Sequence, residues 1–386
     1  MKKIIQKIKN SKLEFSKLKN ADVLLLDDNY AKLKFNKDIK VKLQDRNKIN
    51  LIVLIKAIKD LLFLKNKKIS DSYFINYINE INPKISIGHE YNGQVFRLKK
   101  FFPNKKTILY QLADQSDFFL KTSKKLISRN LNLKENLKSD YFLVKNTYSK
   151  SFYNFIETKF IVAGSIKNNE TKTKSSNKEF DIMFISQFRE KVQDYCGTNN
   201  NIGSMRTIDT FSSFICKILN TLSKKYNKKI AVALTSNRKD KMKNFESQPN
   251  LKENEKDFFK RDLENFYYDD TENTTLAEKS KLIVTINSTL GLELLSRGMK
   301  VIFFDLYHFI GGSPLENLVE GKTGLFWFRE NKKDLIEKKI IEVLETNHED
   351  WKNNLNKINP MIFDEDNKIL KDLVYKLLNT NAAPTR

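Results

Sequence analysis

Two hydroxyl side chains stand together at a strand-to-helix turn of this 386-residue chain. Ser288 and Thr289 follow an apolar, β-branched run at 282–286 and precede a segment at 290–297 whose leucines recur at helical spacing. The first N–H groups of a helix have no partner inside it and the helix dipole is positive there, so a phosphate binds well at such a place. Ser and Thr are also ordinary N-caps, and the local pattern leaves phosphate binding and capping equally open.

A carboxylate follows the two hydroxyls at helical spacing. Glu293 lies about one turn beyond Thr289, where it could accept hydrogen bonds from the ribose hydroxyls of a ligand bound at the start of the same helix. Gly298 then ends the predicted helix, and the apolar run at 301–304 predicts a second buried strand. Strand, turn, helix and strand make up the building block of a parallel sheet. The alternative is that Glu293 is a solvated helix residue.

The pattern of Ser288-Thr289, Glu293 and Gly298 resembles the donor-binding segment of GT-B glycosyltransferases. The resemblance is closest to the enzymes of bacterial capsule and lipopolysaccharide synthesis, including the Kdo- and sialyl-transferring types. In that family the Ser/Thr pair holds the nucleotide phosphate and the glutamate holds the ribose. Asn287, which precedes the pair in the turn, belongs to the donor-binding set that the resemblance implies.

Three further segments, at 83–102, 161–169 and 182–189, resemble parts of the bacterial surface carbohydrate biosynthesis transferases. The resemblance therefore reaches both halves of the chain, from about residue 22 to residue 328. It implies an α/β fold of the GT-B class, in which two Rossmann-like domains face each other across a cleft.

The order of apolar runs and amphipathic segments also favours open, mostly parallel sheets. Strands are predicted at 22–26, 85–88, 107–111, 141–144, 160–162, 181–186 and 230–234. Helices are predicted at 49–64, 70–82, 95–102, 207–224, 332–346 and 367–378. The polar segment 167–178 shows no periodicity and is predicted to be a linker. It would join an acceptor-side domain at 1–166 to a nucleotide-sugar-binding domain at 179–386 that includes the terminal helices.

An acceptor hydroxyl must lose a proton as it attacks the anomeric carbon of a sugar, so an inverting transferase needs a base. Ligands of open α/β sheets bind at the carboxyl ends of strands, and His89 and Glu90 follow the strand at 85–88. Related sialyl- and Kdo-type enzymes use an Asp or Glu of the N-terminal domain, so the resemblance favours Glu90 as catalytic base. His89 is the second candidate or a substrate contact, and Glu90 could also be a solvated loop carboxylate. Other carboxylates that follow N-terminal strands are Asp27, Asp28 and Asp114.

A departing nucleotide phosphate develops negative charge, which requires preorganised donors. Arg238, Gln187 and Arg189 follow two predicted strands of the C-terminal half, and an arginine can fork onto a phosphate. In this region sialyl- and Kdo-type enzymes often carry a His-Pro pair, whereas here Ser236 and Asn237 precede Arg238. This departure leaves the donor open. Arg238 could also be one of the 70 basic residues of a charged surface.

No pair of aspartates stands at a strand end in a context that suits a divalent metal, although Asp305 follows a strand and could line the pocket. GT-B enzymes usually need no metal, because the helix dipole and basic side chains replace it, so we expect neither a metal nor another cofactor. The sequence has no Walker A and no GxGxxG motif, which disfavours an NTPase and a dinucleotide dehydrogenase.

The formal charge of +23 favours partners such as polyanions or anionic membrane surfaces, although an AT-rich genome is the first explanation for the abundance of lysine. Lysines are spread along the whole chain without a nucleic-acid-binding motif, so nucleic acid is not the expected partner. Cys196 and Cys216 are the only cysteines, which suits a reducing cytoplasm. The most apolar window, at 51–64, is too short and too charged to span a bilayer. We expect a cytoplasmic protein, soluble or peripheral on the inner membrane.

These inferences predict a GT-B glycosyltransferase, metal-independent and inverting, although the residues alone leave retention open. The resemblance implies a CMP-activated acidic sugar as the nucleotide-sugar donor. It implies a bacterial surface polysaccharide or lipid-linked glycan as acceptor. Three alternatives remain: a glycerophosphotransferase that uses CDP-glycerol on the same fold, a basic nucleic-acid-binding protein, and an inactive relative that serves as a scaffold.

Overall fold

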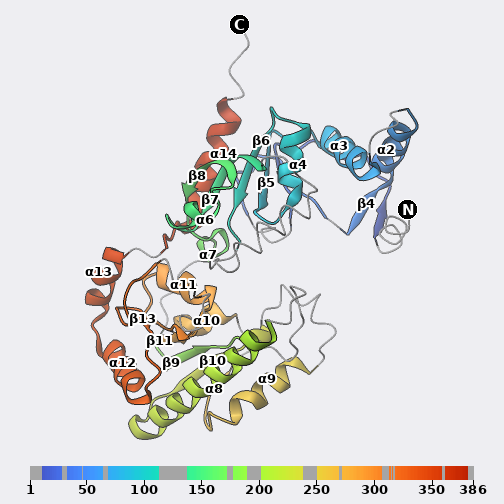
Figure 1. Ribbon diagram of the computed structural model, residues 1–386. Coiled ribbons are helices and arrows are strands. Elements are labelled where there is room, and N and C mark those ends of the chain that lie inside the picture. The colour runs from blue at the N-terminus through green and yellow to red at the C-terminus, as the bar shows by residue number, and fades with distance from the viewer. Residues whose placement is uncertain are drawn as a thin grey trace. The chain divides into compact units, whose positions relative to one another are not determined.

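The computed structural model describes residues 11–27, 33–45, 47–63, 68–112, 137–171, 177–188, 201–237, 250–268, 272–306, 313, 315, 318–358 and 361–380. These residues form two α/β domains (Figure 1). The first domain holds the described residues up to 171 together with 364–380, and the second domain holds those from 177 to 363.

The first domain is built on a six-stranded parallel sheet in the order β3-β2-β5-β6-β7-β8. Its strands are β2 (Val23–Leu25), β3 (Val41–Leu43), β5 (Ile85–His89), β6 (Lys106–Tyr110), β7 (Leu137–Val144) and β8 (Ile156–Val162). Strand β3 pairs on one side of β2 and β5 on the other. The strand order therefore reverses between β2 and β5, which is the topological switch point of a doubly wound sheet.

Helices close an apolar core on each face of this sheet. The helices are α2 (Leu51–Phe63), α3 (Ile69–Ile81), α4 (Gly93–Phe101), α6 (Ser149–Phe152), α7 (Ile166–Asn169), η4 (Glu365–Asn367) and α14 (Lys368–Thr380). Successive strand residues face opposite sides, so Leu24 packs in the core with α3 and α4, while Val23 and Leu25 pack in the other core. Strands buried on both faces explain the continuous apolar runs in the sequence.

The terminal helix α14 belongs to the first domain and not to the C-terminal domain, where the sequence analysis placed it. Its residues Leu370, Val374 and Leu377 lie in the same core as Val23 and Leu25, and Figure 1 draws α14 against β7 and β8. The amphipathic pattern of this helix could not reveal which sheet its apolar face covers. The predicted linker differs as well, because its first residues complete helix α7, in which Asn168 and Asn169 are buried.

Smaller elements that the sequence analysis did not anticipate complete the first domain. Strands β1 (Lys12–Glu14) and β4 (Lys48–Asn50) form a separate two-stranded parallel sheet, and α2 begins directly after β4. These strands are only three residues long, so they carry no periodic signal that sequence reasoning could detect.

The second domain has a five-stranded parallel sheet in the order β10-β9-β11-β12-β13. Its strands are β9 (Phe180–Ile185), β10 (Ile230–Ala233), β11 (Ser280–Thr285), β12 (Val301–Phe304) and β13 (Trp327–Phe328). Its helices are α8 (Asn201–Tyr226), η1 (Thr235–Asn237), α9 (Leu251–Lys260), α10 (Asn273–Glu278), α11 (Thr289–Ser296), α12 (Lys333–Glu345) and α13 (His348–Ile358). Strand β10 pairs on one side of β9 and β11 on the other, so the switch point of this sheet lies between β9 and β11.

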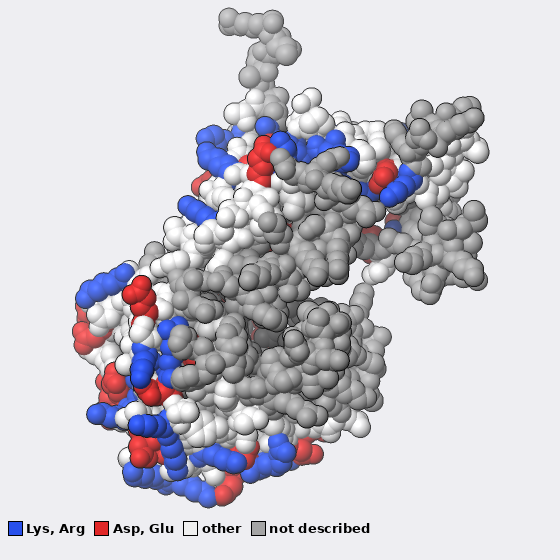
Figure 2. All heavy atoms as spheres, in the orientation of Figure 1, with Lys and Arg blue, Asp and Glu red and all other residues white. Residues whose placement is uncertain are grey.

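On the face drawn in Figure 2, Lys and Arg side chains stand at several separate places, with Asp and Glu among them. No helix in the described part of the chain is long and apolar enough to cross a membrane.

Candidate functional site

The predicted donor-binding turn joins β11 to α11 at the switch point of the second sheet. Strands β9 and β11 are hydrogen-bonded neighbours. The backbone N–H of Asn287 donates to Gln187 Oε1 at 3.2 Å, and the N–H of Ser288 donates to Thr285 Oγ1 at 3.2 Å. The structure therefore brings Gln187 and Asn287 together where ligands of doubly wound sheets bind.

Ser288 occupies the N-cap position of α11, but its side chain makes no capping hydrogen bond. Only its carbonyl takes part in the first turn, where it accepts the N–H of Gly291 at 2.9 Å. The side chain is 4 % exposed, and the neighbouring Thr289 is half-buried. Capping of the helix therefore does not account for the hydroxyl of Ser288.

Gly291 lets the first turn of α11 lie directly against the sheet. A Cβ atom at this position would lie 2.8 Å from Thr285 Cγ2 and 2.8 Å from Phe303 Cζ, closer than real Cβ contacts come. Glycine is therefore required at position 291 because a Cβ would clash with these two side chains, and not because the backbone conformation demands it. The close approach fixes the N-terminus of α11 beside the carboxyl ends of β11 and β12.

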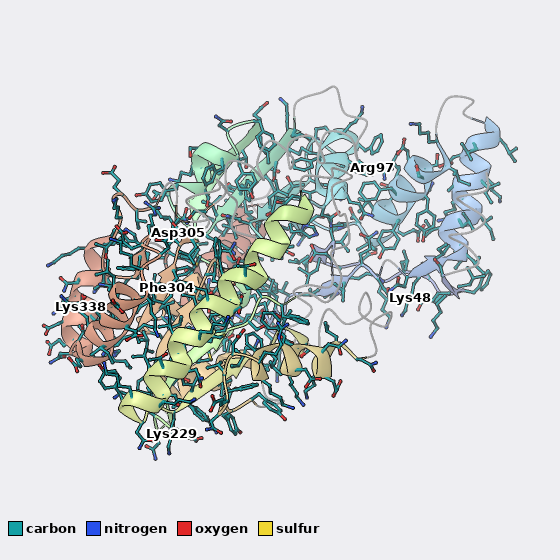
Figure 3. All side chains as sticks on the ribbon, turned by 60° about the horizontal axis from the view of Figure 1, so that its bottom comes forward. Lys48, Arg97, Lys229, Phe304, Asp305 and Lys338 are labelled. Carbon is teal, nitrogen blue, oxygen red and sulfur yellow. The ribbon has the colours of Figure 1, made fainter. Side chains whose placement is uncertain are left out.

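A buried ion pair stands at the ends of the next two strands. Arg329 Nε donates to Asp305 Oδ2 at 2.9 Å, and the two side chains are 5 % and 0 % exposed. Arg329 Nη1 also donates to the carbonyl of Gly321 at 2.9 Å. Figure 3 labels Phe304 and Asp305, where β12 ends at the carboxyl edge of the sheet. It also labels Lys229, which precedes β10 at the amino edge.

Three buried polar atoms on the residues that follow β11, β12 and β13 have no hydrogen-bond partner among the described residues. They are Asn287 Oδ1, Asp305 Oδ1 and Arg329 Nη2. Each follows one of three adjacent strands, and the register that pairs Thr285 with Phe303 puts Asn287 and Asp305 at equivalent positions after β11 and β12. Buried polar atoms are normally satisfied, so the edge offers one donor and two acceptors to a bound molecule.

A second buried carboxylate fixes the other side of this edge. Glu255 of α9 accepts hydrogen bonds from the backbone N–H groups of Thr235 and Ser236, at 2.8 and 3.0 Å, and from the hydroxyl of Ser186. It thereby ties the turn after β9 to the start of η1 after β10. Burial raises the pKa of Glu255, against the lowering effect of these hydrogen bonds.

The remaining predicted donor residues are not all gathered in one place. Glu293 is half-buried on α11, and its charge acts on Arg297 one turn further along. Arg189 and Arg238 lie outside the described residues.

In the first domain, Asp27, His89 and Tyr110 meet at the carboxyl edge of the sheet beside its switch point. Asp27 Oδ1 accepts the hydroxyl of Tyr110 at 2.6 Å, and Asp27 Oδ2 accepts the backbone N–H of His89 at 3.3 Å. His89 Nδ1 accepts the N–H of Tyr91 at 3.1 Å, which leaves the proton of a neutral imidazole on Nε2. His89 therefore faces its surroundings as a hydrogen-bond donor. Asp28 and Asp114 lie outside the described residues.

Glu90, the predicted catalytic base, is completely buried rather than a loop carboxylate in solvent. Both of its carboxylate oxygens accept the backbone N–H of Leu112, at 2.8 and 3.1 Å, and Oε1 also accepts the hydroxyl of Tyr153 at 3.3 Å. The carboxylate thus fixes the chain just after β6. A base with this environment has no exposed oxygen for an acceptor hydroxyl.

The turn that carries these residues is held by Asn92. Its Oδ1 accepts the N–H of Gln94 and caps α4, while its Nδ2 donates to the carbonyl of Leu26 at 2.9 Å. Gly88 lies under the same turn, where a Cβ would be 2.7 Å from Val95 Cγ2. The β5–α4 turn is therefore rigidly joined to the end of β2.

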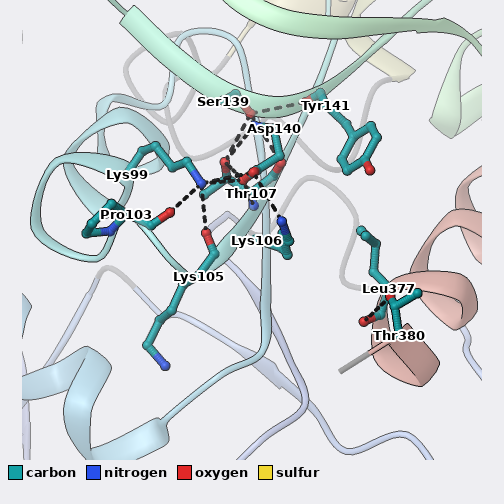
Figure 4. A network of polar contacts seen from close by, with 10 residues as sticks. All are labelled: Lys99, Pro103, Lys105, Lys106, Thr107, Ser139, Asp140, Tyr141, Leu377 and Thr380. Atoms are coloured by element: carbon teal, nitrogen blue, oxygen red, sulfur yellow. Dashed lines mark hydrogen bonds and ion pairs between the residues drawn. The ribbon is translucent and has the colours of Figure 1, made fainter. Parts of the chain in front are cut away.

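The amino edge of the first sheet is occupied by a structural network instead (Figure 4). Both oxygens of Asp140 accept from Lys99 Nζ, at 2.8 and 2.9 Å, and Oδ2 also accepts the backbone N–H and the hydroxyl of Thr107 at 2.8 and 3.0 Å. Lys99 further donates to the carbonyl of Pro103 at 2.7 Å. This network joins α4, β6 and β7 on the side away from the candidate site.

Three residues of the site were missed by sequence reasoning. Arg329 directly follows the apolar run 326–328, a strand-end signal that could have found it. Tyr110 lies within the predicted strand 107–111 and was interpreted only as part of it, whereas it is the last residue of β6. Glu255 lies in a polar helix and carried no local signal, since its partners are between 19 and 69 positions away.

Comparison with protein families adds an independent observation. Residues 115–378, more than half of the chain, match the model of a family described as "putative O-antigen biosynthesis protein". The chain belongs to this O-antigen biosynthesis family. No curated protein matches it.

Solved structures share the fold of this O-antigen biosynthesis family member. A UDP-N-acetylglucosamine 2-epimerase, described as putative, from Listeria monocytogenes superposes with a TM-score of 0.55 at 12% identity, over 94% of this chain and 97% of its own. The UDP-GlcNAc 2-epimerase from Neisseria meningitidis, bound to UDP-GlcNAc, gives 0.50 at 13% identity, over 92% and 99%. Sucrose-phosphate synthase from Thermosynechococcus elongatus gives 0.44 at 11% identity, over 84% and 80%. The two domains of this chain, each built on a parallel sheet, and its match to these structures confirm the predicted GT-B class with Rossmann-like domains.

Proposed function

We propose that this O-antigen biosynthesis family member is a glycosyltransferase that moves a sugar from a nucleotide-sugar donor to a surface glycan. One observation carries the proposal: at the carboxyl edge of the second sheet, the hydroxyl of Ser288 makes no capping hydrogen bond, and buried polar atoms of Asn287, Asp305 and Arg329 have no partner among the described residues. A nucleotide sugar offers phosphate oxygens and hydroxyls that match such a set of donors and acceptors.

The donor residues have separate roles in this proposal. Ser288, Thr289 and the N-terminus of α11 bind the phosphate, where the hydroxyls and the helix dipole favour the negative charge of the leaving nucleotide. Glu293 binds the ribose hydroxyls. Arg189 and Arg238, on the segments after β9 and η1, remain proposed phosphate contacts.

Asp27 replaces Glu90 as the proposed base, because Asp27, although buried, keeps an exposed fraction of 5 %, whereas Glu90 is 0 % exposed. Asp27 takes the proton of the acceptor hydroxyl as the oxygen forms its bond to the anomeric carbon. The bond from that carbon to the phosphate oxygen breaks, and the nucleotide leaves with the electron pair. His89, with its proton on Nε2, donates a hydrogen bond to the acceptor, and Glu90 positions the edge. The scheme inverts the anomeric centre and uses no metal.

The proposed donor is a CMP-activated acidic sugar of the Kdo or sialic type, supported by the Ser288-Thr289 and Glu293 pattern. The proposed acceptor is a bacterial surface polysaccharide or lipid-linked glycan, in keeping with the O-antigen family. We place the reaction at the cytoplasmic face of the inner membrane, where nucleotide sugars are available. UDP must be tested as well, since the Neisseria relative is bound to UDP-GlcNAc.

A thermal-shift panel of CMP, CDP, UDP, GDP and ADP tests the donor site. A ligand that binds only the folded state raises the melting temperature. We expect one nucleotide to stabilise the wild type and the Ser296→Ala control, which alters the far end of α11. The Ser288→Ala/Thr289→Ala variant should lose the shift while its own melting temperature stays near that of the wild type. Absence of any shift, or a shift that survives the double change, would sink the donor-site assignment.

Transfer to an acceptor tests the base. Asp27→Asn should lower kcat by about a hundredfold or more while the thermal shift with nucleotide is retained. Glu90→Gln should lower the melting temperature, and it should lower kcat per folded molecule less than Asp27→Asn does. A larger loss of kcat in Glu90→Gln than in Asp27→Asn would return the catalytic role to Glu90.

A second candidate is epimerisation of the sugar at C2, because the two structures that match almost the whole chain with TM-scores of 0.50 and 0.55 are UDP-GlcNAc 2-epimerases by name. Incubation with UDP-GlcNAc and no acceptor separates the two. An epimerase would form the C2 epimer under these conditions, whereas a transferase leaves the nucleotide sugar unchanged apart from slow hydrolysis.

A further inference from the structure

The ion pair of Asp305 and Arg329 makes only one of the two hydrogen bonds that its geometry permits. Nε and Nη2 lie on one side of a guanidinium, and together they can donate two parallel hydrogen bonds to a carboxylate. Here Arg329 Nε donates to Asp305 Oδ2 at 2.9 Å, while Asp305 Oδ1 and Arg329 Nη2 have no partner among the described residues. The remaining nitrogen, Nη1, donates to the carbonyls of Val319 and Gly321, at 3.5 and 2.9 Å. The pair therefore keeps one acceptor atom and one donor atom for a third group.

The strand register places this pair next to the start of α11. Thr285 and Phe303 are paired across β11 and β12, and a Cβ at Gly291, in the first turn of α11, would lie 2.8 Å from both of their side chains. Asp305 continues β12 beyond Phe303, because its N–H donates to the carbonyl of Phe328 at 3.0 Å. Side chains two positions apart on a strand face the same side, so Asp305 lies on the face that α11 covers. The pair therefore stands beside the helix N-terminus to which the proposed function assigns the phosphate.

A hydroxyl group suits both of these atoms at once, because it donates one hydrogen bond and accepts others. Its O–H would donate to Asp305 Oδ1, and its oxygen would accept from Arg329 Nη2. A phosphate or carboxylate oxygen only accepts, so it would face the lone pairs of Asp305 Oδ1, and an ammonium group only donates. The two side chains are 0 % and 5 % exposed, so water does not compensate for a ligand group that fails to match them. The pair therefore selects a hydroxyl over a charged group.

We infer that Asp305 and Arg329 bind a hydroxyl of the sugar that is transferred, and that they thereby select the donor by its sugar. The inference rests on the proposed function, which assigns the phosphate to Ser288 and Thr289 and the ribose to Glu293. The sugar bonded to the phosphate is then the part of the donor whose hydroxyls still lack a binding residue. A sugar with a hydrogen or a charged group at this position is rejected, because the buried pair stays unsatisfied. The carboxylate of an acidic sugar must accordingly bind elsewhere.

Titration of the full-length protein with matched ligands separates the sugar from the nucleotide. The matched ligands are UDP and UDP-GlcNAc, CMP and CMP-N-acetylneuraminic acid, and GDP and GDP-mannose. The wild type should bind one of these nucleotide sugars at least about tenfold more tightly than its nucleotide. This gain in affinity should vanish in Arg329→Met/Asp305→Leu, which removes both hydrogen-bonding groups without leaving a buried charge unpaired. Arg329→Lys keeps a charge beside Asp305 but has no second nitrogen, so it should lose most of the gain as well.

Deoxy analogues of the nucleotide sugar that binds identify the hydroxyl. Removal of the hydroxyl that the pair binds should weaken binding to the wild type by about tenfold or more and leave binding to the double variant almost unchanged. Removal of any other hydroxyl should affect the two proteins equally. The control is Asp140→Asn, which breaks a partly buried ion pair in the first domain and should keep the full gain from the sugar.

The outcomes separate this inference from the proposed function. If the wild type binds no nucleotide and no nucleotide sugar, the proposed function itself is wrong. If a nucleotide binds and its sugar adds no affinity in the wild type, the inference alone is overturned. It is also overturned if both variants keep the gain, because the pair then holds a buried water only. Equal weakening of nucleotide and nucleotide sugar in both variants overturns it as well, because the pair would then bind the nucleotide.

Discussion

Asp305 and Arg329 form a buried ion pair in which each partner keeps one buried polar atom that has no hydrogen-bond partner among the described residues. The pair stands at the carboxyl ends of β12 and β13, on the edge that also holds Asn287. Removing two charges from water is costly, and the attraction and hydrogen bonds of a buried pair often do not repay that cost, so the pair is weak evidence of a role in stability alone. The two polar atoms without partners are consistent with a site at which a bound molecule supplies the missing hydrogen bonds.

Loss of one member of this pair should cost more than loss of both. Arg329→Met leaves the carboxylate of Asp305 buried without its charge partner, and the free energy of unfolding should fall by about 3–5 kcal/mol. The double variant Arg329→Met/Asp305→Leu removes both charges and should regain part of that loss. Urea denaturation of the two variants and the wild type measures the difference. Equal destabilisation by the single and double changes would contradict the prediction.

The two N-cap positions should respond differently to alanine. Asn92→Ala removes the cap of α4 and the bond to the Leu26 carbonyl, so it should cost about 1–2 kcal/mol. Ser288→Ala removes no capping bond and should change the free energy of unfolding by less than about 0.5 kcal/mol. Thermal unfolding of both variants checks the pair. A large loss for Ser288→Ala would mean that its hydroxyl has a structural role.

The network at the amino edge should be important for stability and not for ligand binding. Asp140→Asn leaves Lys99 without its carboxylate and should lower the free energy of unfolding by about 2–3 kcal/mol. The control Glu157→Gln breaks an exposed ion pair with Lys138 and should cost less than about 1 kcal/mol. Nucleotide binding, measured by titration of folded protein, should be equal in both. A loss of binding in Asp140→Asn alone would show that the two edges are coupled.

An alanine at Gly291 should destabilise the protein although alanine favours helices. The gain in helix propensity is about 1 kcal/mol, whereas a methyl group 2.8 Å from both Thr285 and Phe303 costs about 1–3 kcal/mol in overpacking. The net effect should be a lower melting temperature, together with a weaker nucleotide shift because the N-terminus of α11 is pushed away from the sheet. A higher melting temperature would show that the contact relaxes easily.

Stability should depend on pH through Glu255. Burial raises the pKa of its carboxyl above that of the unfolded chain, so its contribution to stability is fully present below the unfolded pKa and is lost as pH rises through the folded pKa. Relative to Glu255→Gln, which cannot ionise, the wild type should lose free energy of unfolding as pH rises from about 4 toward neutrality. Denaturation of both proteins across that range gives the difference. A difference that is constant with pH would argue against the raised pKa.

The turns of the candidate site were predictable because their signals are local. The apolar runs that become β5 and β11 end at polar turn residues, and the helices after them begin within two residues of the expected positions. Other features depend on distant partners. Glu90 is buried because the N–H of Leu112 and the hydroxyl of Tyr153 reach it, 22 and 63 positions along the chain. The partners of Arg329 and Glu255 likewise come from other elements, and sequence spacing gives no measure of such contacts.

The position of α14 has a consequence for the order in which the protein folds. Asn169 Nδ2 donates to Asn367 Oδ1 across 198 positions of sequence, and Leu370, Val374 and Leu377 close the core over β2 and β5. During synthesis, the first sheet therefore emerges from the ribosome long before the helix that covers one of its faces. The second domain can fold in that interval, while the open apolar face of the first must wait or be sheltered by a chaperone.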